Sequence, residues 1–130
     1  MSAMTPATAW WRWPGVAAAA AGACAVILGA LGAHALHAQL SPRMLDVWQV
    51  AVRFQFWHAL ALAVCALLRP AHAAHLAAVL FAAGIVLFCG SLYALALGAP
   101  HALGVITPLG GLALIGGWVA LGVAFFRHRD

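Results

Sequence analysis

Four long runs of apolar residues constrain the fold of this chain more than any other feature. They extend over residues 14–36, 47–68, 74–97 and 103–126. Each run has about 22 to 24 residues, enough for an α-helix to cross a hydrocarbon core of about 30 Å. Lipid offers the backbone no hydrogen-bond partners, so such runs cross a membrane as helices. The sequence therefore predicts an all-α integral membrane four-helix bundle that forms a single domain over residues 1–130.

The composition agrees with a surface that faces lipid. Of the 130 residues, 67% are hydrophobic and only 6% are charged, whereas a soluble domain has about 25% charged residues. The formal net charge is +4, but the arginines stand singly near the ends of the apolar runs and form no basic patch. We therefore expect the lipid bilayer as a partner and no nucleic acid.

The distribution of arginines predicts an orientation in the membrane. With four crossings, both termini and the middle loop lie on one side. That side carries Arg12, Arg69, Arg127 and Arg129. The other side carries Arg43 and, if its side chain extends outward, Arg53. Because cytoplasmic loops are enriched in basic residues, we expect both termini in the cytoplasm.

The second run is the least regular, because Arg53 interrupts it. We expect its guanidinium to extend toward the headgroups of the outer interface. Asp46, seven residues earlier on the same helical face, is its candidate partner. We also expect Trp48 to face lipid and to mark the outer interface.

Six polar residues lie inside the apolar runs, and the alternating topology places them all in the outer half of the membrane. They are His34, Gln55, His58, Ser91, Tyr93 and Thr107. A polar group in hydrocarbon needs a hydrogen-bond partner. The favoured interpretation is a structural network that ties the helices together. The other is a small pocket, or a proton-handling site, that opens outward.

Small residues recur at helical spacing on three of the four helices. These stripes are Gly22, Gly29 and Ala33; Gly90, Ala94 and Gly98; and Gly116, Ala120 and Ala124. Helices in lipid associate through such small faces, because apolar burial between helices gains little there. The stripes therefore predict sites of close helix approach.

No motif of enzyme chemistry stands out. The acidic residues are Asp46 and Asp130, too far apart in the sequence to predict a carboxylate pair. His34 and His37, or His72 and His75, have a spacing that could serve a metal, but no Cys, Asp or Glu stands beside them. We therefore expect no enzyme activity, no metal and no cofactor.

Four motifs in order resemble a known family. They are GALGAH at residues 29–34, FQFWHALAL at 54–62, LFCGSLYAL at 87–95, and ITPLGG at 106–111 with Gly117 and Trp118 after it. In this order they resemble the DUF423 family of small bacterial inner-membrane proteins, to which a small eukaryotic transmembrane protein is also similar. The resemblance implies a four-helix protein of the bacterial cell inner (plasma) membrane with no established activity. It also implies an acidic residue where this chain has Arg53.

Two functions follow as hypotheses. The first is a structural or accessory membrane protein that binds a partner or lipid through its Gly-rich helix faces. The alternative is a subunit of an oligomeric transporter or channel for a small solute or protons, with the polar residues as its site. A monomer of 13.4 kDa leaves little room for a pore, so the alternative requires a homo-oligomer or a membrane-protein partner.

Overall fold

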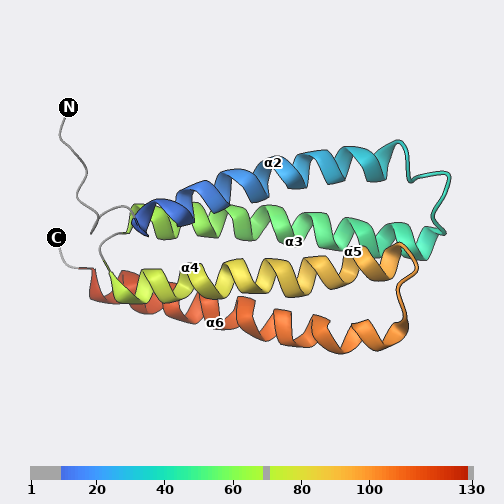
Figure 1. The fold of residues 1–130 in the computed structure, drawn as a ribbon. Coiled ribbons are helices and arrows are strands. Elements are labelled where there is room, and N and C mark those ends of the chain that lie inside the picture. The colour runs from blue at the N-terminus through green and yellow to red at the C-terminus, as the bar shows by residue number, and fades with distance from the viewer. Residues whose placement is uncertain (1–9, 69–70, 129–130) are drawn as a thin grey trace.

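The structure, a computed structural model, describes residues 10–68 and 71–128, and these form four long helical segments (Figure 1). The first is α2 (Trp13–Ala33), which follows the short 3₁₀ turn η1 (Trp10–Arg12), and the second is α3 (Pro42–Leu67). The third consists of α4 (His72–Gly84), the π-helical turn η2 (Ile85–Cys89) and α5 (Gly90–Ala96). The fourth consists of the 3₁₀ turn η3 (His101–Val105) and α6 (Ile106–Arg127). The described residues contain no strand, and all four segments are long and apolar enough to cross a membrane, which confirms the all-α class.

Consecutive segments run antiparallel, so the bundle has two distinct ends (Figure 1). At one end, here called the terminal end, α2 and α4 begin and α3 and α6 stop. At the other, the loop end, lie the connections over residues 34–41 and 97–100.

Helix α3 begins at Pro42, five residues before the start expected from its apolar run. The Ser41 side chain accepts a hydrogen bond from the Met44 backbone N–H at 3.2 Å, and Pro42 occupies the first turn. A serine cap followed by proline is a favourable helix start, because proline has its φ preset and needs no N–H there. The helix has 26 residues, about 39 Å, and Arg53 lies well inside it.

The core lies where α3, α4 and α6 meet. Phe81 of α4 and Leu62 of α3 are almost fully buried, and Leu114 and Leu121 of α6 pack with them. Many large apolar side chains point outward instead, among them Val26, Leu112 and Val119, each 65% exposed. Such an apolar exterior is suited to lipid and not to water.

The third segment, over α4 and η2, is approached closely by α6 through glycines. A Cβ added to Gly117 would lie 2.6 Å from the Phe81 ring, and one added to Gly110 would lie 2.7 Å from Cα of Phe88. The predicted stripe on α6 lies inside this contact. Gly116 faces Leu80, and both Ala120 and Ala124 are buried, at 7% and 3% exposure.

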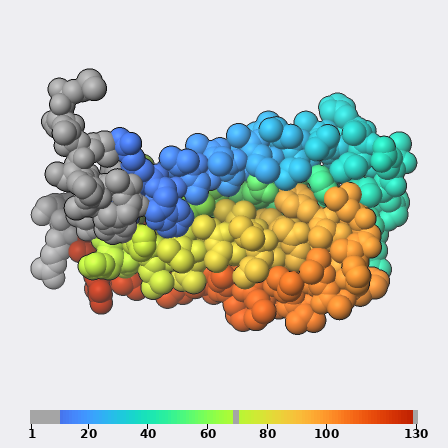
Figure 2. All heavy atoms as spheres, in the orientation of Figure 1, coloured from blue at the N-terminus to red at the C-terminus, as the bar shows by residue number. Residues whose placement is uncertain are grey.

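Helix α2 is the peripheral member of the bundle. It packs against α3 and η1 and has little contact with the other long helices. Figure 2 shows it as a ridge along one edge of the molecule. Only 17% of its most apolar stretch is buried, against 39% for α3, so most of α2 is left to face other membrane components.

Candidate functional site

Gln55 joins three helices. Its Nε2 donates to the carbonyl oxygen of Ala21 on α2 at 2.9 Å, and its Oε1 accepts from the Tyr93 hydroxyl on α5 at 2.8 Å. The side chain is 4% exposed. Both ends of the amide are therefore used to hold α2, α3 and α5 together.

Trp48 lies inside the bundle, and the expectation that it faces lipid is wrong. It is 4% exposed, and its indole N–H donates to the carbonyl oxygen of Leu28 at 2.8 Å. Its ring also meets the Tyr93 ring edge-on, with centroids 4.7 Å apart. Gly32 makes room for it, since an added Cβ there would lie 2.7 Å from the indole. A paired N–H and a gap left by glycine thus stabilise the inward position.

His58 links α3 to α6. Its Nδ1 lies 2.6 Å from the Phe54 carbonyl oxygen, and its Nε2 accepts from the Trp118 indole N–H at 3.1 Å. Since Nε2 is the acceptor, the proton of a neutral ring resides on Nδ1 and is donated to Phe54. The sequence does not predict that Trp118 pairs with His58, because pairing depends on which way each helix face turns.

Ser91 and Thr107 form a third tie, between α5 and α6. The Ser91 hydroxyl donates to the Phe88 carbonyl oxygen at 2.9 Å, and its oxygen lies 2.6 Å from the Thr107 hydroxyl. Because a serine hydroxyl has one proton, Thr107 is the donor of the second bond. This tie is anchored on the π-helical turn η2, which contains Phe88.

The structure thus replaces the single polar cluster expected from the sequence with three separate ties. Five of the six expected residues take part in them. His34 does not: it is exposed just after the end of α2, where its backbone N–H bonds to Ala30. Nor do the ties share one depth, since Ser91 and Thr107 lie toward the loop end while His58 lies past the middle of α3.

The arginines that the structure describes lie at the surface. Arg12 and Arg127 are exposed at the terminal end, and Arg43 is exposed at the loop end. Arg69 and Arg129, the other two topology residues, lie outside the described residues. Within the described part of the chain, three or more His, Cys, Asp or Glu side chains nowhere gather as a metal site would require.

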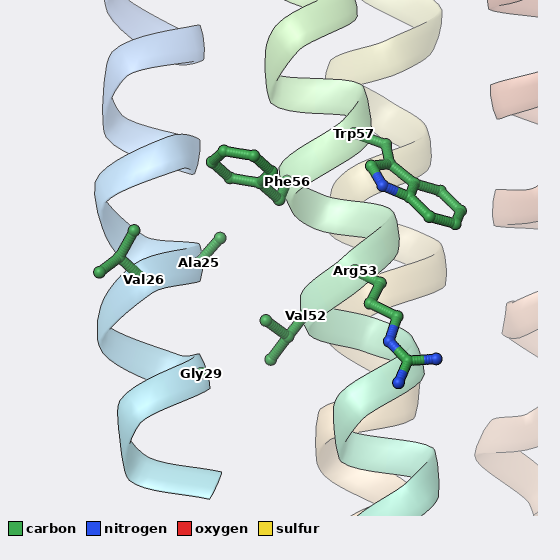
Figure 3. Close-up of a pocket in the computed structure, with 7 residues that line it drawn as sticks. All are labelled: Ala25, Val26, Gly29, Val52, Arg53, Phe56 and Trp57. Atoms are coloured by element: carbon green, nitrogen blue, oxygen red, sulfur yellow. The ribbon is translucent and has the colours of Figure 1, made fainter. Parts of the chain in front are cut away.

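Arg53 lines an open groove between α2 and α3 (Figure 3). The groove measures about 320 Å³. Its walls are Ala25, Val26, Gly29, Val52, Arg53, Phe56 and Trp57. Val52 and Phe56 point toward α2, whereas Arg53 projects from the adjoining face of α3 with its guanidinium directed toward the loop end (Figure 3).

Arg53 has no counterion in the described part of the chain. It is exposed, and it makes neither an ion pair nor a hydrogen bond with residues 10–68 or 71–128. The pairing with Asp46 expected from the sequence is therefore absent there. A smaller hollow of about 170 Å³ extends the same groove past Ala33 and Gln49.

Comparison with known proteins settles the family. The sequence model of the family described as "Protein of unknown function (DUF423)" matches residues 28–111. The chain belongs to this family. The DUF423 match begins on α2 and reaches into α6, so it includes all three polar ties except the Ala21 carbonyl and the indole of Trp118.

Curated relatives of this DUF423 protein are named only as membrane proteins. The UPF0382 membrane protein YwdK of Bacillus subtilis is 43% identical over 108 residues, which covers 80% of this chain and 88% of the relative. A UPF0382 membrane protein of Staphylococcus haemolyticus is 41% identical over 101 residues, covering 76% and 83% of the two chains. No solved structure matches at a significant level. The chain is thus a small multi-pass membrane protein of a family without an assigned activity.

Proposed function

We propose that this protein is an accessory protein of the bacterial cell inner membrane, which binds a transmembrane helix of a partner protein along the α2–α3 groove. The groove is lined by Ala25 and Gly29 on one wall and by Val52 and Arg53 on the other. In this role the protein has no enzymatic activity, and its two termini lie in the cytoplasm.

The observation that carries the proposal is Arg53. It lies near the middle of a 26-residue spanning helix, is exposed, and has no counterion among the described residues. A charge at such depth is costly, and charged residues within membrane helices are retained where they pair with another group. A carboxylate on a partner helix would supply that group and could accept two parallel hydrogen bonds from the guanidinium.

The opposite wall of the groove supports a helix as the occupant. Ala25, Gly29 and Ala33 lie four residues apart along α2, so they share one face. A Cβ on Gly29 would meet only Val52, at 3.4 Å. Ala25 is already buried, but Gly29 is half-buried and Ala33 is exposed, and small residues of this kind let a second helix backbone approach closely.

The structure supports transport less well than partner binding. A transport path would need polar side chains to face a passage. Gln55, His58 and Ser91 instead make hydrogen bonds to neighbouring helices. Their chemistry is used in holding the bundle together.

Photo-crosslinking in native membranes tests the proposal. A photoreactive amino acid at Val26, which lines the groove, should give a discrete protein adduct, identified by mass spectrometry. The same group at Leu112, equally exposed but on α6, should give none. Arg53→Gln should reduce the Val26 adduct, whereas Arg53→Lys should retain most of it. Equal adducts from Val26 and Leu112, or indifference to Arg53→Gln, would contradict partner binding in the groove.

The orientation is supported by the exposed arginines of the terminal end. A fluorescent protein fused after Asp130 should fluoresce, because this reporter matures in the cytoplasm and not after export. An exported reporter active at the same site, such as alkaline phosphatase, would show the orientation to be reversed.

A further inference from the structure

A second groove, between α4 and α6, opens at the terminal end of the bundle. It measures about 530 Å³, and it is separate from the α2–α3 groove. Its main lining residues are His72, Leu76, Gly116, Val119, Val123 and Arg127. We call it the α4–α6 groove.

The α4–α6 groove is polar at one end and apolar over the rest of its length. Arg127 is the last residue of α6 and His72 is the first residue of α4. Because the two helices are antiparallel and Ala74 packs beside Ala124, these two residues lie at the same level. Both side chains are exposed. The groove therefore joins a cationic mouth to an apolar trough.

The trough has the length of one membrane leaflet. From Arg127 to Gly116 the α6 backbone rises about 16 Å, and half of a hydrocarbon core of about 30 Å is about 15 Å. Its exposed apolar walls, Leu76 at 53% and Val119 at 65%, would contact an acyl chain along this length. An extended hydrocarbon chain with its headgroup at the mouth matches these dimensions.

The charge at the mouth selects the headgroup. By sequence the terminal end has four arginines against one acidic residue, Asp130, and the acidic residue that the structure describes, Asp46, lies near the loop end. Arg127 makes no ion pair within residues 10–68 and 71–128. We propose that the α4–α6 groove binds one anionic phospholipid, with the phosphate between Arg127 and His72 and an acyl chain along Leu76, Val119 and Val123.

Native mass spectrometry of the detergent-solubilised protein tests this site. Phosphatidylglycerol and phosphatidylcholine with identical acyl chains are titrated onto the full chain. The first phosphatidylglycerol should bind about five-fold more tightly, which corresponds to the ~1 kcal/mol that one arginine contributes at an anionic surface. Arg127→Gln should remove this preference, and Arg127→Lys should keep it.

Matched variants separate the groove from diffuse charge. Arg129→Gln removes the same charge two residues away and should leave the preference unchanged. Val119→Trp fills the trough and should weaken the binding of both lipids, whereas Leu112→Trp, at an equally exposed site on α6, should not. Thermal unfolding of each variant verifies that it is folded.

Two results would overturn the proposal. One is equal affinity of the unmodified chain for the two lipids. The other is an equal loss of phosphatidylglycerol binding in Arg127→Gln and Arg129→Gln, which would assign the attraction to the net charge of this end. Neither result bears on the α2–α3 groove, which lies between other helices.

Discussion

The two helix pairs of this bundle are held together by different means. Between the third segment and α6, glycines of α6 bring backbones and rings into direct contact, as at Gly110 against Phe88 of η2 and Gly117 against Phe81 of α4. Between α2 and α3, two side chains reach across to backbone carbonyls, and an open groove lies beside them. The two side chains are Gln55, which bonds to the Ala21 carbonyl, and Trp48, which bonds to the Leu28 carbonyl.

The difference shows how a small protein can combine stability with an open surface in lipid. Close packing brings many atoms into contact and so fixes a helix at many points along its length. Individual hydrogen bonds fix the position of a helix at a few points. Helix α2 is therefore held in place while most of its surface stays free to contact other membrane components.

Gly110→Ala should lower the free energy of unfolding the most, because it adds a methyl group where the helices are most tightly packed. The new methyl group would overlap the backbone of Phe88, which has no flexible end that could move aside. We expect a loss of about 2 to 3 kcal/mol in the free energy of unfolding, as is typical of overpacking. Titration with sodium dodecyl sulfate, followed by circular dichroism, measures it.

The neighbouring glycine provides the control for this prediction. A Cβ on Gly111 would lie 3.8 Å from the Phe88 ring, an ordinary contact. Gly111→Ala should therefore be near neutral. If both alanine variants were equally stable, close packing would not be what holds η2 to α6.

Gln55→Ala should have a smaller effect, confined to the other pair. It removes the bond to Ala21 and leaves the Tyr93 hydroxyl without its acceptor. We expect a loss of about 1 to 2 kcal/mol in the free energy of unfolding. Hydrogen exchange should accelerate in α2 and stay slow in α6.

Gln49→Ala is the matched control, since this amide is on the same helix and makes no side-chain hydrogen bond with residues 10–68 or 71–128. It should leave the exchange of α2 unchanged. Faster exchange in α6 than in α2 on loss of Gln55 would show that the two pairs do not open independently.

Trp118→Phe should have the smallest effect. Phenylalanine keeps most of the ring contact with Phe81, whose centroid lies 5.3 Å from that of Trp118, and removes only the N–H that His58 accepts. We expect a loss of about 0.6 kcal/mol, the average for a hydrogen bond between membrane helices. The same titration measures it, with Trp57→Phe at a 55% exposed site as control. Equal losses in both variants would assign the effect to ring size.

The number and order of the helices could be predicted from the sequence. Apolar runs of membrane length, separated by Ser41-Pro42, Arg69-Pro70 and Gly98–Pro100, leave little choice in lipid. The start of α3 was placed too late because Ser41-Pro42 was interpreted only as a break. The same pair is also a cap followed by a first-turn proline, a signal that places the start of the helix at Pro42.

The hydrogen-bond partners could not be predicted in the same way. Depth in the membrane follows from position along a helix, but pairing also depends on which way each face turns. The π-helical turn at Ile85–Cys89 changes the facing of the residues after it relative to a regular α-helix, and apolar periodicity does not reveal such a turn. Trp48 illustrates a further difficulty, because tryptophan is common at membrane interfaces and only the neighbouring Gly32 signals that it can turn inward.

The bond between Gln55 and Tyr93 has a consequence for biosynthesis. The two residues are 38 positions apart, so at about 5 to 20 residues per second the ribosome adds Tyr93 about 2 to 8 s after Gln55. Ala21 is made before Gln55, so the first hairpin can close on its own amide–carbonyl bond. Until Tyr93 has been added, the amide oxygen of Gln55 lacks the hydroxyl that donates to it in the finished structure. Completion of the second hairpin then fixes the first one in place.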